Sequence, residues 1–246
     1  MQLAVTLYRT VLTWVAGVMA TIIGASLVLF LVLVDPASPR IEKVINWWAR
    51  VWLLASGTEL TIEGQENIDP SQSYVVVANH LSTLDIMVCF IAVPVPIRYL
   101  AKKELFRIPL LAQAMRAIGI IEVDRAARVS IHNSVNRQAR ELIEHHRSLI
   151  IYPEGTRPRD GVMKPFKKGA FTMAVASQLP VLPLSIHGTH QAAAPGKPWF
   201  RGGAVTAIVD PAIPTVGMSP GDADGLRDRV REIIAKRVSD LGGAVG

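Results

Sequence analysis

The chain has 246 residues and a formal net charge of +6, and half of its residues are apolar. This length predicts one domain of ordinary size with a small additional segment. The basic balance favours an anionic partner. However, the cations are spread along the chain and no nucleic-acid-binding motif is present, so a lipid membrane explains the charge better than DNA or RNA. The single cysteine, Cys89, excludes an internal disulfide.

A long apolar segment lies near the N-terminus. Residues 11–34 contain no charged side chain, and these 24 residues are enough for a bilayer span, which needs about 20. A cleaved signal peptide fits less well, because the apolar stretch is long and no small-x-small pattern directly precedes Asp35. The alternative to a span is a helical hairpin that breaks near Gly17 or Gly24 and lies in one leaflet.

The charges around this segment predict its orientation. Only Arg9 comes before it, whereas three basic residues follow soon after it, namely Arg40, Lys43 and Arg50. Positively charged flanks of membrane segments stay on the cytoplasmic side. We therefore expect the rest of the chain to lie in the cytoplasm.

Residues 41–55 have the pattern of an amphipathic helix. One face is apolar and consists of Ile41, Val44, Ile45, Trp48, Trp52 and Ala55. Polar residues occupy the other face, and the cluster of tryptophans is typical of a helix that lies in a membrane interface. The alternative is a core helix whose apolar face packs on a sheet. We therefore predict an N-terminal membrane anchor over residues 1–56, and a second domain over residues 57–246.

The second domain alternates strand and helix patterns. β-Branched or apolar runs predict strands over residues 60–63, 74–78, 97–101, 118–123, 149–152, 181–186 and 204–209. Helical periodicity predicts helices over residues 85–93, 131–143, 170–177 and 226–238. Repeated strand-helix units indicate an α/β fold with a mostly parallel central sheet flanked by helices. The glycine-rich residues 242–246 predict a frayed tail.

A histidine and an aspartate five residues apart follow the strand predicted at residues 74–78. His80 falls in the turn after the strand, and Asp85 falls in the first turn of the next helix, with Ser82 as the cap. A carboxylate bound to one ring nitrogen fixes the tautomer and leaves the other nitrogen free to take a proton from a hydroxyl. The alternative is that Asp85 only caps the helix and His80 is an ordinary loop residue.

Three further segments, each tied to a predicted strand, occur in a fixed order after this pair. The residues of interest in them are Arg125, then Glu154, Gly155, Thr156 and Arg157, and finally Pro183. Together with the histidine and aspartate, they resemble the motifs of the glycerolipid acyltransferases, specifically the bacterial 1-acylglycerol-3-phosphate (lysophosphatidate) acyltransferases. The resemblance covers about residues 55–210. Four motifs in order are far more specific than any one of them.

The resemblance implies a reaction. The family moves a fatty acyl group from a thioester of acyl carrier protein or coenzyme A to the 2-hydroxyl of 1-acylglycerol-3-phosphate, which gives phosphatidate. His80 is then the general base and Asp85 orients it. A thiolate is a good leaving group, so the hydroxyl attacks the thioester directly, with no acyl-enzyme, no metal and no cofactor beyond the acyl carrier. The resemblance also implies a bacterial inner membrane, with the catalytic domain on its cytoplasmic face.

The acceptor of this reaction carries a phosphate, and the resemblance implies a set of residues for it. The expected phosphate-binding residues are Lys102, Arg125, Glu154, Gly155, Thr156 and Arg157. The cations supply charge, the glycine permits close backbone approach, the threonine can donate a hydrogen bond, and the glutamate orients the loop or an arginine. Lys103 is the alternative to Lys102. The ends of parallel strands lie along one edge of a sheet, where ligands usually bind.

Other interpretations remain. The acceptor could instead be lyso-ornithine lipid, glycerol-3-phosphate or another lysophospholipid, and a noncatalytic lipid-binding membrane protein is the alternative from another class. Ser82 lacks the glycines of a hydrolase nucleophile elbow, and Cys89 on an apolar helix face is expected to be a buried thiol. His187 and His190 have no clear third metal ligand beside them. The turn-rich residues 158–165 either gate the acceptor or form an inert turn.

Overall fold

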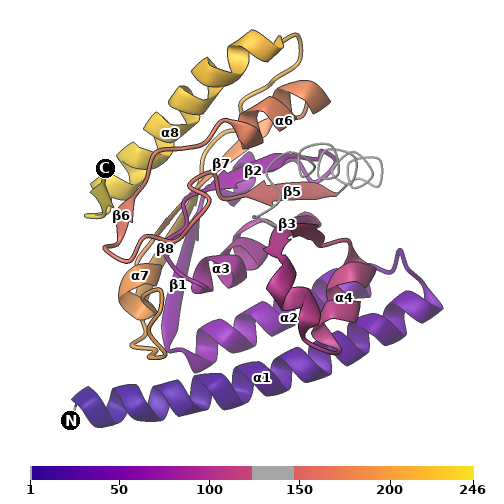
Figure 1. Ribbon diagram of the computed structural model, residues 1–246, viewed down its shortest axis with the longest axis vertical. Helices are drawn as coiled ribbons and strands as arrows, with labels where there is room; N and C mark the ends of the chain where they lie inside the picture. The colour runs from indigo at the N-terminus through magenta and orange to yellow at the C-terminus, as the bar shows by residue number, and fades with distance from the viewer. Residues whose placement is uncertain (1, 124–146) are drawn as a thin grey trace.

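The computed structural model describes residues 2–123 and 147–246 (Figure 1). The predicted strands are present there as β1 (Thr58–Glu63), β2 (Val75–Ala78), β3 (Ile97–Lys102), β4 (Ile121–Val123), β5 (Ser148–Ile151), β7 (Val181–His187) and β8 (Gly203–Val209). The helices are α1 (Gln2–Val34), α2 (Arg40–Ala55), α3 (Leu84–Ala92), α4 (Leu111–Ile118), α6 (Gly169–Ser177), α7 (Thr189–Ala192) and α8 (Ala223–Asp240). The helix predicted at residues 131–143 lies outside the described residues, as does Arg125.

In the described part of the chain, the seven strands form one sheet in the order β1-β8-β7-β2-β5-β3-β4. The run β7, β2, β5, β3 and β4 is parallel throughout. Strand β8 is antiparallel to β7 and parallel to β1. The predicted mostly parallel α/β fold is therefore confirmed. The carboxyl ends of the parallel strands meet at one edge of the sheet, the usual place for a ligand in such folds.

Alternate residues of the central strand β2 face two different cores, as the two-residue period of a strand requires. Val75 and Val77 pack with α6 and α8. Val76 and Ala78 pack with α2 and α3 on the other side. Figure 1 shows the same layers, with α6 and α8 above the sheet and α1, α2 and α3 below it. Helices on both sides explain why β2 has no polar residue.

The N-terminal helix α1 is one unbroken helix of 33 residues. The alternative of a hairpin that breaks near Gly17 or Gly24 is therefore wrong. Gly17 has a packing role, because a Cβ atom there would lie 2.5 Å from ring atoms of Trp52 in α2. The helix is long and apolar enough to cross a membrane. Figure 1 shows that it runs beside α2 along the whole base of the domain.

Polar side chains hold α1 against the rest of the molecule. The Phe200 N–H donates to Thr10 Oγ1 at 3.0 Å, and Trp48 Nε1 donates to Thr21 Oγ1 at 2.9 Å. Arg9, the charged residue of this helix, donates from Nη1 to a backbone carbonyl of the loop before β8. Contacts at several points of the helix make α1 a part of the folded domain. The opposite side of α1 exposes large apolar side chains.

The apolar face of α2 packs inward. Its buried residues are Ile41, Ile45, Ala49 and Leu53. Trp52 meets Trp14 of α1 edge to face, with ring centroids 5.8 Å apart, and Trp48 packs against the core beneath α2. On the polar side, the fully buried Arg98 of β3 pairs with Glu42 at 2.5 Å. The core-helix alternative is thus confirmed for α2, and the membrane-interface interpretation of its apolar face is wrong.

Two smaller expectations also need correction. The C-terminal tail is not frayed: β9 (Ala244–Val245) pairs in parallel with β6 (Val162–Met163), in the loop that follows the Glu154 motif. The strand predicted from residue 118 begins only at Ile121, because α4 continues to Ile118. Gly119 then ends this helix with a φ of +90°, a left-handed conformation that glycine adopts without strain.

Candidate active site

Asn79 leads the chain out of β2 at the carboxyl edge of the sheet. Its Nδ2 donates to the Ile186 carbonyl of β7 at 2.8 Å, and its Oδ1 accepts the Ile186 N–H at 2.8 Å. Through these two hydrogen bonds the Asn79 side chain extends the pairing of β2 with β7 by one residue. Asn79 is buried. His80, the next residue, therefore starts from a fixed point at the strand end.

His80 and Asp85 form a hydrogen-bonded pair. His80 Nδ1 and Asp85 Oδ2 are 2.8 Å apart, and the aspartate is fully buried while 13% of the histidine side chain is exposed. The same oxygen accepts the backbone N–H groups of Leu81 and Ser82, each at 2.7 Å. The chain after β2 therefore wraps around one carboxylate oxygen. The predicted pairing is confirmed, and Nε2 is the ring nitrogen left for a substrate.

Tyr152 covers the flat side of this histidine. The two rings are stacked, with centroids 3.8 Å apart and planes 10° from parallel. Tyr152 follows β5, which pairs with β2 so that Ile151 is opposite Val77. Sequence reasoning treated Tyr152 only as the end of a strand. Its proximity depends on strand pairing, which leaves no mark in the local sequence.

Glu154 supports the loop that carries the second motif. The residue is 3% exposed, and Oε1 accepts the His80 N–H at 2.6 Å while Oε2 accepts the Lys164 N–H at 3.0 Å. Both oxygens bind backbone amides, so this residue orients the loop, as predicted, and ties it to the turn after β2. Burial raises the pKa of Glu154 to about 7, although the two amide hydrogen bonds partly oppose this.

This raised pKa predicts a pH-dependent stability. Because the fold favours the neutral carboxyl, the stabilisation is complete below about pH 4.5 and is lost as pH rises to about 7. The size is roughly 3 kcal/mol, at 1.36 kcal/mol per pKa unit. We expect the free energy of unfolding of the wild type to fall, over this range, relative to that of Glu154→Gln, which cannot ionise. Denaturant unfolding of both proteins at several pH values measures it; a constant difference would contradict the prediction.

The rest of the motif lies over the N-terminus of α3. Gly155 has a φ of +74°, a left-handed backbone conformation that favours glycine. Arg157 Nη1 donates to Thr83 Oγ1, directly before α3. Thr156 is exposed. The loop therefore brings a half-exposed arginine to the helix that carries Asp85.

The remaining predicted cations are distributed differently. Lys102 is exposed at the end of β3, and Lys103 begins the short 3-10 helix that follows. Both lie at the carboxyl edge of the sheet, two strands from β2, so the choice between them stays a prediction. Arg125 lies outside the described residues, two positions after β4 ends at Val123.

The cysteine, serine and histidine that the sequence analysis did not assign to catalysis lie in surroundings that fit structural roles. Cys89 is buried, and burial raises the pKa of its thiol to about 12. Ser82 is buried too, accepts the Leu84 N–H at 3.2 Å and donates to the Ala193 carbonyl at 2.7 Å. The N-cap position of α3 is Thr83, so the predicted cap at Ser82 is wrong by one residue. His187 lies beside Gly243, on the α8 side of the sheet. No group of three or more potential metal ligands occurs among the described residues.

A parallel α/β sheet with a histidine-aspartate pair at its carboxyl edge, followed by a glycine-containing loop with an arginine, defines the class of this protein. The sequence matches the Acyltransferase family model over residues 59–187, which is more than half of the chain. The chain belongs to the acyltransferase family.

Comparison with individual proteins narrows this class. The human 1-acyl-sn-glycerol-3-phosphate acyltransferase alpha is 33% identical over 175 residues, which make up 71% of this chain and 62% of the human protein. The Limnanthes douglasii 1-acyl-sn-glycerol-3-phosphate acyltransferase is 34% identical over 183 residues, or 74% of this chain and 63% of that protein. The matched region thus spans less than two thirds of these relatives. The crystal structure of the 1-acyl-sn-glycerophosphate acyltransferase PlsC from Thermotoga maritima matches with a TM-score of 0.85, 28% identity and 98% coverage of both chains.

Proposed function

We propose that this protein transfers a fatty acyl group from a thioester to the 2-hydroxyl of 1-acylglycerol-3-phosphate, and so makes phosphatidate. The observation that carries this proposal is the His80–Asp85 hydrogen bond of 2.8 Å at the carboxyl end of β2. It occurs in a chain that matches the Thermotoga maritima acyltransferase over 98% of its length. The acyl donor is the thioester of acyl carrier protein or coenzyme A.

His80 acts as the base in this mechanism. The buried Asp85 carboxylate binds Nδ1–H and leaves Nε2 to take the proton from the acceptor hydroxyl. The oxygen then attacks the thioester carbonyl carbon, the C–S bond breaks, and the departing thiolate recovers a proton from the imidazolium. General-base catalysis contributes roughly 10²–10⁴-fold, so positioning of the two substrates supplies much of the rest.

Arg157 binds the acceptor phosphate in this proposal, together with Arg125 and Lys102 from neighbouring strand ends. Its support is the position of Arg157, which is half-exposed and reaches Thr83 at the start of the helix that carries Asp85. Charge-assisted hydrogen bonds of a guanidinium suit phosphate oxygens. Glu154 contributes indirectly, because it holds the loop through the Lys164 amide.

The membrane surface is the second partner. The acceptor is a lipid, and α1 exposes a row of large apolar side chains on the side turned away from the domain. Because α1 is packed along the domain by its other side, it lies in one leaflet rather than crossing the bilayer. The membrane is the bacterial inner membrane and the catalytic domain lies on its cytoplasmic face, where acyl carriers occur.

A pair of charges on the outer side of α1 should therefore release the protein from membranes. Val18 and Ile22 are 46% and 47% exposed, one helical turn apart. We expect Val18→Glu/Ile22→Glu to move the protein into the soluble fraction and to lower turnover of bilayer-embedded acceptor. Activity on detergent-dispersed acceptor should stay within about twofold, since no site residue changes. Val216→Glu, at a side chain 81% exposed elsewhere, is the matched control. Membrane retention of the double variant through a salt wash would contradict this role of α1.

A single assay tests the reaction itself. Purified protein is incubated with acyl carrier protein and coenzyme A thioesters against lysophosphatidate, lyso-ornithine lipid, glycerol-3-phosphate and other lysophospholipids. We expect phosphatidate from lysophosphatidate with at least one donor. Faster acylation of another acceptor would assign a different substrate to the same site, and failure with every pair would leave a noncatalytic lipid-binding protein.

A further inference from the structure

The stacking of Tyr152 on His80 restricts a motion of the imidazole ring that the hydrogen bond to Asp85 still allows. One hydrogen bond at Nδ1 fixes the distance from the ring to Asp85, but it does not prevent the ring from tilting about that bond. A tilt moves Nε2, the atom that must face the acceptor hydroxyl. Displacement of a catalytic group by about 1 Å can cost about 10²-fold in rate. A flat surface 3.8 Å from the ring, and 10° from parallel, opposes such a tilt on one side.

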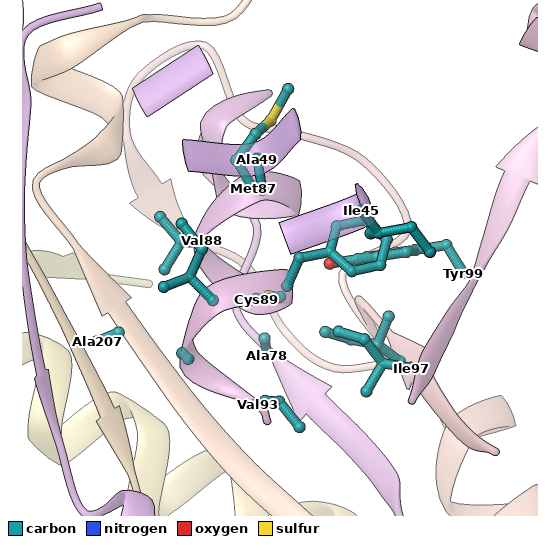
Figure 2. Packing of buried hydrophobic residues seen from close by; sticks show 14 of the residues in the cluster. Ile45, Ala49, Ala78, Met87, Val88, Cys89, Val93, Ile97, Tyr99 and Ala207 are labelled. Carbon is teal, nitrogen blue, oxygen red and sulfur yellow. The ribbon is translucent and has the colours of Figure 1, made fainter. Parts of the chain in front are cut away.

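Tyr152 is itself held in place. Its hydroxyl lies 3.4 Å from Cys89 Sγ, and the ring of Tyr99 lies beside it, with centroids 6.0 Å apart and planes 28° from parallel. The Tyr99 hydroxyl in turn donates to the Ile86 carbonyl at 2.9 Å. Figure 2 shows Cys89 of α3 facing Tyr99 of β3 inside this core. Burial raises the pKa of Tyr152 well above its usual range, so its hydroxyl stays protonated and can donate.

These contacts converge on one helix. Cys89 and Ile86 belong to α3, and so does Asp85, which binds the edge of the His80 ring. The same rigid element thus fixes the edge of the imidazole directly and its face through Tyr152. The position of Tyr152 also follows from β5, because Ile150 and Tyr152 project to the same side of the sheet as α3.

We propose, on the basis of the function above, that Tyr152 is a positioning residue that holds the plane of the His80 ring for proton transfer. The aromatic face provides the effect, and the hydroxyl serves only to anchor the tyrosine to Cys89. Phenylalanine should therefore replace it, whereas an aliphatic side chain should not.

The test compares Tyr152→Leu, Tyr152→Phe and a matched control. The control is Tyr74→Leu, which removes a buried tyrosine beside the start of the same strand β2, with its hydroxyl bonded to the Asp69 backbone and no contact with His80. We expect Tyr152→Leu to lower kcat by about 10-fold or more, with both KM values within about twofold. Tyr152→Phe should keep kcat within about threefold. Tyr74→Leu should lower the melting temperature while keeping kcat.

A second measurement reads the stack directly. An aromatic face so close shifts the ring protons of His80 upfield in NMR spectra, and His80→Ala identifies the signal. We expect Tyr152→Phe to retain this shift and Tyr152→Leu to lose it. If Tyr152→Leu does not fold, Tyr152→Met replaces it, because an unbranched apolar side chain fills irregular space.

The outcomes separate this proposal from the function on which it rests. Normal kcat in Tyr152→Leu, an equal loss in Tyr152→Phe, or an equal loss in Tyr74→Leu would each overturn the positioning role. His80→Ala is assayed in parallel. If it retains turnover, the base mechanism itself is wrong; if it is inactive while Tyr152→Leu is fully active, only the role of Tyr152 fails.

Discussion

Replacement of His80 by alanine should lower the turnover of lysophosphatidate by roughly 10²–10⁴-fold, the usual contribution of a general base. The KM for each substrate should change little, because the ring contributes to proton transfer rather than to binding. Asp85→Asn should lose most of the same factor. The aspartate oxygen accepts from His80 and from two backbone amides at 2.7 to 2.8 Å, and an amide in its place brings no negative charge to hold the imidazolium.

The matched control for this prediction is His187→Ala. His187 ends β7, the strand next to β2, but it lies beside Gly243 on the opposite side of the sheet from α3. Its loss should leave turnover within about twofold. Initial rates under saturating donor, together with far-UV circular dichroism to confirm the fold, provide the measurement. Near-normal turnover in a folded His80→Ala protein would exclude the base mechanism.

The parts of the site that sequence predicted correctly are local. His80 and Asp85 lie five residues apart, and a strand end followed by a helix start places them close together. The sequence therefore favours the contact, although a capping role for Asp85 alone fits the same pattern. The strands could also be predicted from the sequence, because a buried parallel strand needs an uninterrupted apolar run. Val75 to Ala78 satisfies that pattern on both sides of the sheet.

The parts that sequence did not predict depend on the order of strands. Tyr152 stacks on His80 because β5 lies next to β2, and Glu154 binds the His80 N–H for the same reason. Both contacts join residues more than seventy positions apart. The local sequence shows an aromatic residue after a strand and a glutamate before a glycine, but it does not predict which distant residue each will contact.

The error over α2 has a different origin. An amphipathic pattern shows that one side of a helix avoids water, but it does not tell whether protein or lipid covers that side. In the structure α1 and α3 cover it, and Gly17 lets α1 approach Trp52. The lipid-facing role that we propose falls instead to α1, whose outer apolar residues are exposed. Removal of residues 1–40 would therefore expose part of the core and also delete the proposed membrane contact.

Arg157→Ala should raise the KM for lysophosphatidate by about 10- to 100-fold, the equivalent of the 1.5–3 kcal/mol of a hydrogen bond to a charged group. The KM for the acyl thioester should stay within about twofold, because the donor in this mechanism does not use the acceptor phosphate site. Arg157→Lys should recover only part of the loss, since a lysine keeps the charge but lacks the planar fork that binds two phosphate oxygens.

Arg159→Ala is the matched control for this arginine, because it is an exposed cation two positions along the same loop. Thr83→Ala is the second control, since it removes the hydroxyl that Arg157 contacts in the absence of substrate. Both variants should keep the acceptor KM within about threefold. For Thr83→Ala the reason is that a phosphate would replace the Thr83 contact of Arg157 when the acceptor binds. For Arg159→Ala the reason is that this cation has no phosphate-binding role in the proposal. Steady-state kinetics with each substrate varied in turn decides the outcome. If Arg157→Ala affects both KM values equally, Arg157 serves the loop rather than the phosphate, and the acceptor charge must be met by Lys102 or Arg125.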